Sequence, residues 1–190
     1  MLNIKGLTIA REDKILSYEL QLSEGKILAI QGVSGVGKST LLSAIAGFVE
    51  PISGTLHWHD SSLTQLPVEE RPVSYLFQDH NLFEHLSVLD NLSLGFAGTA
   101  PKDELIEAAK ALKVADQLAK RPGELSGGQR QRIALIRTLL REEPLVLLDE
   151  PFAELDPETR RLTVTWVKKT AKEKDVNNGH SSSRRCRAVG

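Results

Sequence analysis

The sequence predicts an α/β fold in which buried parallel strands alternate with helices. An apolar run at residues 27–30 leads into a glycine-rich stretch at residues 32–40, and a helix-compatible run at residues 41–46 follows. A second apolar run, residues 145–148, has the length and composition of a strand that is buried on both faces. With 190 residues the chain is large enough for one globular domain.

Composition and charge narrow the classes of partner and compartment. The net charge is −1 and the sequence pI is about 6.5, so no basic excess indicates a nucleic-acid partner. A single cysteine, Cys186, excludes an internal disulfide framework and fits a reducing compartment. No signal-peptide pattern opens the chain, and no apolar run reaches the roughly 18 residues of a membrane span. We therefore expect a cytoplasmic protein that reaches any membrane through a partner.

The N-terminal half reads as short strands around one helix. Residues 2–7 and 15–22 predict two strands, separated by a charged turn at residues 11–14. Gly47 is expected to end the first helix, which starts with residues 41–46. Further strands are predicted at residues 55–59 and 73–77, and the second of these runs directly into Gln78.

The C-terminal half is mostly helical by pattern. Residues 103–119 carry apolar side chains at helical spacing. Ser126 can cap a following helix that continues to Leu140, and Pro157 can open the last helix. Residues 177–190 show no apolar period, so they are not expected to form an ordered element.

The stretch at residues 32–40 has the form of a phosphate-binding loop, G-x-x-x-x-G-K-S. Glycines let the backbone approach phosphate oxygens closely, and the helix that follows turns its N–H groups toward an anion. Lys38 adds a point charge for the β- and γ-phosphates of a nucleotide, and the Ser39 hydroxyl can bind Mg²⁺. The residues predicted to bind the nucleotide here are Gly32, Val33, Ser34, Gly35, Val36, Gly37, Lys38, Ser39 and Thr40.

Two carboxylates end the buried strand at residues 145–148. Asp149 is expected to lie beside the phosphate loop and to hold Mg²⁺, as a Walker B aspartate does. Glu150 follows it and is placed to act as a general base toward an attacking water. Two acidic residues at a strand end would alone be weak evidence for a catalytic site. The phosphate loop upstream in the chain makes this interpretation of Asp149 and Glu150 much more specific.

A second phosphate pocket is predicted where the helix after Ser126 begins. The run Leu125-Ser126-Gly127-Gly128-Gln129 exposes several N–H groups at a helix start. One nucleotide needs only one phosphate loop, so two pockets indicate a nucleotide bound between two copies of the chain. Ser126, Gly127, Gly128 and Gln129 are the residues predicted to contact the second copy's nucleotide.

With these motifs in place, residues 1–176 resemble the ATP-binding subunits of ABC transporters. The resemblance rests on the phosphate loop, Gln78, the Leu125–Gln129 signature, the Walker B strand and Glu154-Leu155-Asp156. It implies a RecA-like P-loop core, an N-terminal antiparallel β layer and an inserted helical subdomain at about residues 79–142.

The resemblance also implies roles and partners. Two copies would close head to tail on two ATP molecules with Mg²⁺ and dock on membrane permease subunits, with a periplasmic solute-binding protein as an indirect partner. That places the protein peripherally on the cytoplasmic face of the inner membrane. Gln78 would sense the γ-phosphate and Mg²⁺, and Glu150 would be the base. Leu82, Phe83 and Leu86 would line the groove for the permease, although Phe83 could equally be a core residue.

A narrower similarity points to the ATPases of bacterial thiamine importers. It rests on residues 71–78, 81–83 and 122–125, which read RPVSYLFQ, NLF and PGEL. ATPases of sulfate, iron, polyamine and molybdate importers share much of this pattern, so they remain alternatives. Two further alternatives remain. One is a non-transport ABC ATPase, which would usually carry a coiled-coil insertion, and the other is a module that binds ATP without hydrolysing it.

Two departures from the family pattern stand out. Arg11 falls where the family usually places an aromatic residue for adenine, and an arginine can also stack on a flat base. Residues 177–190 are polar where the family continues into an apolar strand ending in Ser-His, so the last core strands are expected to be missing. His180 lies a few residues early for that histidine, and Ser183 falls close to its place. Apolar surface near Leu147 and Val167 should then lie uncovered. We also expect impaired ATPase activity, because the histidine of the family pattern is not in place.

Overall fold

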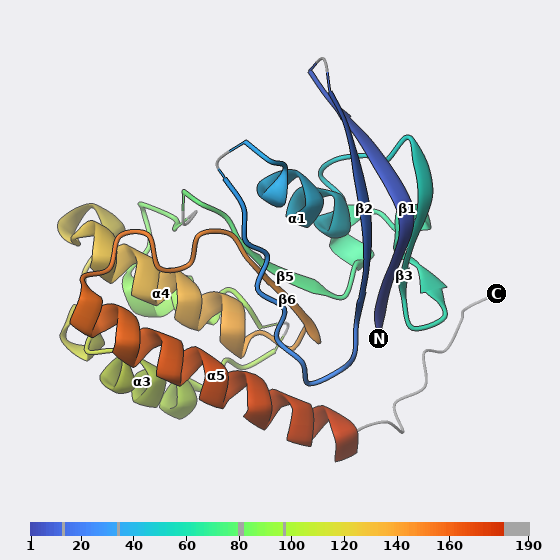
Figure 1. Cartoon of the computed structure of the whole chain (residues 1–190). Helices are drawn as coiled ribbons and strands as arrows, with labels where there is room; N and C mark the ends of the chain where they lie inside the picture. Colours follow the sequence, from blue (N-terminus) through green and yellow to red (C-terminus); the bar gives the residue numbers. More distant parts are fainter. Residues whose placement is uncertain (13, 34, 80–81, 97, 181–190) are drawn as a thin grey trace.

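The structure is a computed structural model that describes residues 1–12, 14–33, 35–79, 82–96 and 98–180, with side chains up to residue 173. It contains an antiparallel sheet and a two-stranded parallel sheet, together with a set of helices (Figure 1). The predicted mixed α/β class and the N-terminal antiparallel layer are confirmed. None of the helices in the described part of the chain is long and apolar enough to cross a bilayer.

The antiparallel sheet is built on a long N-terminal hairpin. Strands β1 (Leu2–Arg11) and β2 (Lys14–Leu22) pair, and β3 (Ser53–Trp58) adds to the other edge of β1, followed by the short β4 (Ser61–Ser62). One face of β1 is apolar and packs inward, with Leu2, Ile4, Leu7 and Ile9 buried. They meet helix α1 (Lys38–Ala46) in one core.

Helix α1 ends at a glycine C-cap. Gly47 has φ 95°, a left-handed conformation that glycine adopts without steric cost. Arg71 lies against it and donates from Nη1 to the carbonyl oxygens of Ala44 and Ile45, at 2.7 and 2.9 Å. Arg71 is only 9% exposed, and its guanidinium gives these carbonyls at the end of α1 a side-chain donor.

The parallel sheet brings two distant parts of the chain together. Strands β5 (Val73–Leu76) and β6 (Leu145–Leu148) pair in parallel, with Val73 opposite Leu145 and Leu76 opposite Leu148. Both strands therefore end at the same edge of the sheet. Pairs of this kind require a long crossover, which here contains most of the helices.

The remaining helices lie together on one side of the molecule (Figure 1) and contribute to two further apolar clusters. They are α2 (Val88–Ser93), α3 (Lys102–Ala111), α4 (Gly127–Leu140) and α5 (Pro157–His180), with 3₁₀ turns at Leu63–Gln65, Val68–Glu70, Ala115–Gln117 and Pro122–Glu124. The expected helix at residues 103–119 is thus interrupted, because Lys113 adopts φ 55° and ends the α-helical path. The helix predicted from Ser126 to Leu140 is confirmed.

The strand expected at residues 27–30 is not formed. Ile27, Leu28 and Ile30 are 59, 47 and 40% exposed. Within the described residues, no backbone hydrogen bond involves residues 27–31. A central strand is held by neighbours on both sides, and none of the described strands pairs with this segment.

The C-terminal expectations need two corrections. Leu147 and Val167 are only 5 and 8% exposed, so both side chains are covered, whereas Ile27, Leu28 and Ile30 are exposed. Helix α5 continues to His180, into the segment for which no ordered element was expected, because extending an existing helix costs far less than nucleating one. Ser183 and the rest of residues 181–190 lie outside the described part.

Candidate functional site: a phosphate loop beside the ends of two parallel strands

The phosphate loop is shaped by glycine and by the hairpin packed on it. Gly37, the residue before α1, has φ 101°. A Cβ atom at this position would collide with the Tyr18 hydroxyl and approach Leu16 Cδ1 to 2.7 Å, so only glycine fits. Tyr18, which lies in the strand predicted at residues 15–22, donates a hydrogen bond from its hydroxyl to the Gly37 carbonyl oxygen at 2.8 Å. The hairpin therefore fixes where the loop turns into the helix.

Lys38 turns back across the loop. Its Nζ donates to the carbonyl oxygens of Gly32 and Val33, at 2.9 and 3.0 Å. The ammonium group is thus held inside the curve of the loop, where a bound phosphate group would replace these carbonyl contacts. Ser39 and Thr40 follow in the first turn of α1, while Ser34 lies outside the described residues.

The expected catalytic residues follow the C-terminal ends of β5 and β6. Since Leu76 pairs with Leu148 in parallel register, Gln78 and Glu150 lie at equal offsets beyond the same edge. The backbone N–H of Asp149 still donates to the Leu76 carbonyl oxygen, at 3.1 Å. Gln78 and Glu150 are exposed, and Asp149 is 7% exposed.

Glu150 also has an unusual backbone conformation. Its φ is 46°, in the left-handed region that non-glycine residues seldom adopt. Such conformations concentrate at functional sites, where the surrounding structure maintains them.

Tyr75 connects Asp149 to the phosphate-loop helix. Its hydroxyl lies 3.5 Å from Ser43 Oγ of α1. Burial raises the pKa of Tyr75, the contact with Ser43 lowers it, and the negative charge of Asp149 raises it. Tyr75 of β5 therefore contacts α1 and is influenced by the charge of Asp149 at the end of β6.

The donor set suits Mg²⁺, although no cluster of three or more His, Cys, Asp or Glu side chains occurs among the described residues. Mg²⁺ is bound by few protein oxygens together with phosphate oxygens and water. A serine hydroxyl, a glutamine amide and a buried aspartate, from Ser39, Gln78 and Asp149, supply such oxygens.

The signature segment begins α4 but lies elsewhere on the molecule. Ser126 is the N-cap, since its Oγ accepts from the Gln129 N–H at 3.3 Å and Gln129 Oε1 accepts from the Ser126 N–H at 2.9 Å. Figure 1 shows this yellow end of α4 at the far left, away from the start of α1. The chain does not bring Ser126, Gly127, Gly128 and Gln129 to its own phosphate loop.

Gln131 is a residue that the sequence patterns did not single out. It is 1% exposed, donates from Nε2 to the Glu150 carbonyl oxygen and accepts at Oε1 from the Glu154 N–H, both at 3.0 Å. The side chain ties the loop after β6 to α4. Gln131 lies on the same helical stripe as Leu135 and Thr138. Its position there could have indicated a structural role, because a polar group at a buried position needs hydrogen-bond partners.

Comparisons with known proteins agree with this arrangement. The ABC transporter family profile matches residues 16–153. The thiamine import ATP-binding protein ThiQ of Vibrio cholerae is 42% identical over 179 residues, covering 92% of this chain and 75% of the relative. ThiQ of Shigella boydii is 42% identical over 181 residues, covering 93% of this chain and 78% of the relative.

Solved structures show the same fold. The bacterial ABC transporter cassette MJ0796, solved as a dimer, matches with a TM-score of 0.80 at 28% identity, covering 92% of this chain and 84% of that one. The same cassette was solved in a post-hydrolysis state bound to ADP and Pi. A putative ABC transporter ATP-binding protein from Pyrococcus furiosus matches with a TM-score of 0.81 at 25% identity, covering 91% of this chain and 86% of that one. The chain belongs to the ABC transporter family, as one of its ATP-binding proteins.

Proposed function

We propose that this chain binds Mg-ATP at its phosphate loop and hydrolyses it to energise an importer, with thiamine or its phosphates as the cargo. The observation that carries the proposal is the shared edge of β5 and β6. Gln78, Asp149 and Glu150 follow directly beyond this edge, and Tyr75 of β5 lies 3.5 Å from Ser43 of the helix that begins with Lys38. The cargo rests on similarity to the thiamine import proteins, and sulfate, iron or polyamine importers are the alternative.

In this proposal each residue has a separate task. Lys38 and the loop N–H groups bind the β- and γ-phosphates, and Glu150 accepts a proton as a water oxygen attacks the γ-phosphorus. The bond from that phosphorus to the β–γ bridging oxygen breaks, which gives ADP and phosphate. Ser39, Gln78 and Asp149 would hold Mg²⁺, which would offset the charge on the phosphates.

The segment Ser126–Gln129 supports a second copy of the chain as the partner. Ser126–Gln129 cannot serve the chain's own loop, so it would close on the nucleotide of a second copy, as the dimeric structure of the relative MJ0796 suggests. Residues 1–176 would form the ATPase domain around a RecA-like core, and residues 79–142 its helical subdomain. That subdomain would dock on membrane permease subunits at the cytoplasmic face of the inner membrane.

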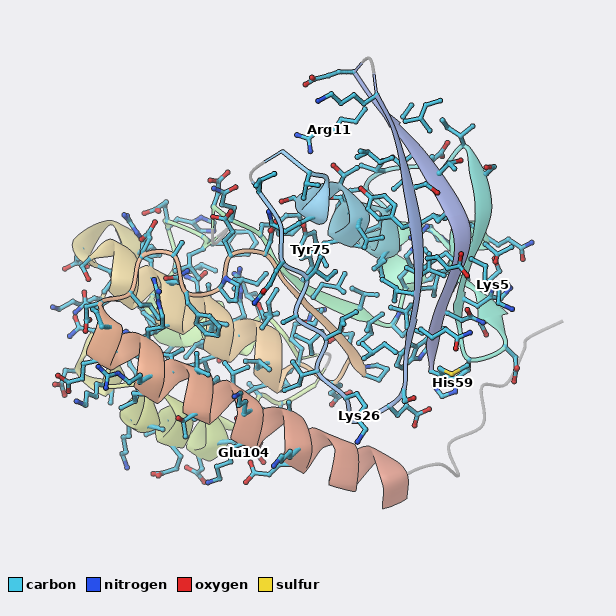
Figure 2. The ribbon with its side chains drawn as sticks, in the orientation of Figure 1. Lys5, Arg11, Lys26, His59, Tyr75 and Glu104 are labelled. Carbon is cyan, nitrogen blue, oxygen red and sulfur yellow. The ribbon has the colours of Figure 1, made fainter. Side chains whose placement is uncertain are left out.

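Matched lysine variants test the nucleotide site. Lys38→Ala should weaken ATP binding by about 2–4 kcal/mol, because it removes a charged phosphate contact. Lys26→Ala is the control, since Lys26 belongs to the same segment but points away from the loop (Figure 2). Isothermal titration calorimetry with equal ATP affinity for Lys38→Ala and wild type would refute the site.

A glutamine variant tests the base and the dimer. Glu150→Gln keeps the shape and removes the proton acceptor, so ATP should still bind while hydrolysis falls and the closed dimer accumulates. Sedimentation with Mg-ATP measures this, and a variant that binds ATP yet stays monomeric would refute the shared site.

A second candidate function is ATP binding with impaired turnover. It is favoured by the exposed segment at residues 27–30, which leads into the phosphate loop without strand neighbours among the described residues. Steady-state ATPase with the permease present separates the two functions, because only the first predicts stimulated turnover.

A further inference from the structure

Arg11 reaches the phosphate loop from the tip of the N-terminal hairpin. It is the last residue of β1, and its Nη1 donates to Thr40 Oγ1 at 2.6 Å. Thr40 is 5% exposed and lies in the first turn of α1, two residues after Lys38. Figure 2 shows the Arg11 side chain directed from the hairpin toward the start of that helix. A strand end thus supplies a cation to a predicted anion site.

The position of Arg11 is supported by its neighbours. Two residues of the paired strand, Leu16 and Tyr18, pack on Gly37, and the Tyr18 hydroxyl bonds the Gly37 carbonyl oxygen. Opposite Arg11 in the hairpin register stands Lys14, another cation. None of the ion pairs formed by described residues involves Arg11. Among the residues that the structure describes, its charge at the loop is therefore not paired with a carboxylate.

The two cations of the site serve different ends of the loop. Lys38 Nζ contacts the carbonyl oxygens of Gly32 and Val33, at the beginning of the loop, whereas Arg11 contacts Thr40 at its end. In loops of this type the lysine binds the β- and γ-phosphates, and the N–H groups at the helix start face the α- and β-phosphates. The contact with Thr40 uses one of five guanidinium donors, so others remain to bind an anion.

We propose that Arg11 binds the α-phosphate of the nucleotide, as a second cation beside Lys38. The inference rests on the proposed ATP site and adds a residue to it. A guanidinium suits phosphate because its donors form a planar fork that matches two oxygens. The competing role for an arginine at this position, stacking on the adenine ring, needs no phosphate and is an outcome of the test.

Inorganic tripolyphosphate distinguishes the two roles, because it carries three linked phosphates and no base. Binding of ATP and of tripolyphosphate is measured by calorimetry for wild type, Arg11→Ala, Arg11→Lys and Arg11→Trp. We expect Arg11→Ala to weaken both ligands about tenfold and by similar factors, as loss of a charge-assisted hydrogen bond does. Arg11→Lys should retain most of the affinity, and Arg11→Trp should not restore it.

Lys14→Ala is the matched control, since it removes one positive charge from the opposite strand of the same hairpin. Its affinities should stay within about twofold of wild type. The proposal is overturned if Arg11→Ala weakens ATP but leaves tripolyphosphate unchanged, if Arg11→Trp restores ATP binding, or if Arg11→Ala behaves like Lys14→Ala.

Lys38→Ala separates failure of the inference from failure of the proposed function. If Lys38→Ala weakens both ligands and Arg11→Ala weakens neither, only the role of Arg11 is wrong. If wild type binds neither ligand, or Lys38→Ala binds both as wild type does, the phosphate site itself is wrong. Melting temperatures of Arg11→Ala and Arg11→Lys close to wild type show that the hairpin remains folded.

Discussion

A carboxylate oxygen of Glu154 approaches Gly127 so closely that a Cβ atom on residue 127 would collide with it. Gly127 is the first residue of α4, and the N-terminal end of a helix attracts negative charge. A Cβ on Gly128 would likewise stand 3.2 Å from the Glu154 carbonyl oxygen and 3.5 Å from Leu155 Cδ2. The loop after β6 thus places a carboxylate on the helix end that is proposed to receive the second copy's nucleotide.

Removing this carboxylate should ease dimer closure. In the Glu150→Gln background, Glu154→Ala should lower the ATP concentration for half-maximal dimer formation about threefold, because a like charge near the phosphates is removed. Sedimentation velocity across an ATP series measures it. Glu158→Ala is the control, since Glu158 is also exposed and faces Lys113, 3.7 Å away. A rise in the required ATP would show that Glu154 supports closure.

Gly47→Ala should destabilise the fold by about 1–3 kcal/mol, the range for a side chain forced into a left-handed conformation. The new methyl group would also meet Arg71 Nε at 2.7 Å and Cζ at 2.8 Å, which would disturb the cap of α1. Urea unfolding measures the loss. Gly98→Ala is the control, because nothing lies within 4 Å of a Cβ there and its φ is not positive. Equal losses for the two variants would contradict the account.

Asp156 should make stability depend on pH. Its Oδ1 accepts from the N–H groups of Glu158 and Thr159, both at 3.0 Å. Hydrogen bonds from the Thr159 side chain, and then from its backbone, lower the pKa of Asp156. A lowered pKa adds stability above the unfolded value of about 3.9, and this contribution disappears as the pH falls through the folded value.

Asp156→Asn keeps the acceptor oxygen and removes the charge, so it isolates this effect. We expect the variant to melt below wild type at pH 7, with a difference that shrinks as the pH falls below about 4. Thermal unfolding followed by circular dichroism measures it. A difference that stays constant across this range would mean that the charge of Asp156 does not stabilise the fold.

Local patterns in the sequence predicted the local elements well. The glycine-rich turn before α1, the Ser126 cap and the run at Leu145–Leu148 each depend on neighbouring residues, and the structure forms all three. Contacts between distant segments were not predictable in this way. Gln131 meets Glu150 and Glu154 only because α4 packs beside the loop after β6.

The segment at residues 27–30 also shows that local sequence patterns do not predict contacts between distant segments. Its apolar run reveals a capacity for burial, but a strand forms only where partners bond its backbone. The sequence reading placed the uncovered surface near Leu147 and Val167, whereas α4 and α5 contribute to the core that contains Val167. Ile27, Leu28 and Ile30 are exposed, and none of the described strands pairs with their segment.

Supplying a strand should therefore stabilise the chain. Replacing residues 177–190 by an apolar strand that ends in Ser-His is expected to raise the melting temperature and the ATPase rate, because Ile27, Leu28 and Ile30 would gain a neighbour. A Gly/Ser tail of the same length is the control. Calorimetry and steady-state ATPase assays measure both effects, and equal values for the two tails would refute the idea.

The amide of Gln131 has a consequence for how two bound ATP molecules influence each other. In the proposed dimer, the start of α4 faces the partner's nucleotide while Glu150 faces the chain's own, and Gln131 joins α4 to Glu150. Each chain would then carry an energetic coupling between the two sites, expressed as a Hill coefficient above one in ATP hydrolysis. Gln131→Met keeps the length of the side chain and removes both hydrogen bonds, so the coefficient should fall toward one; a variant that stays as cooperative as wild type would place the coupling elsewhere.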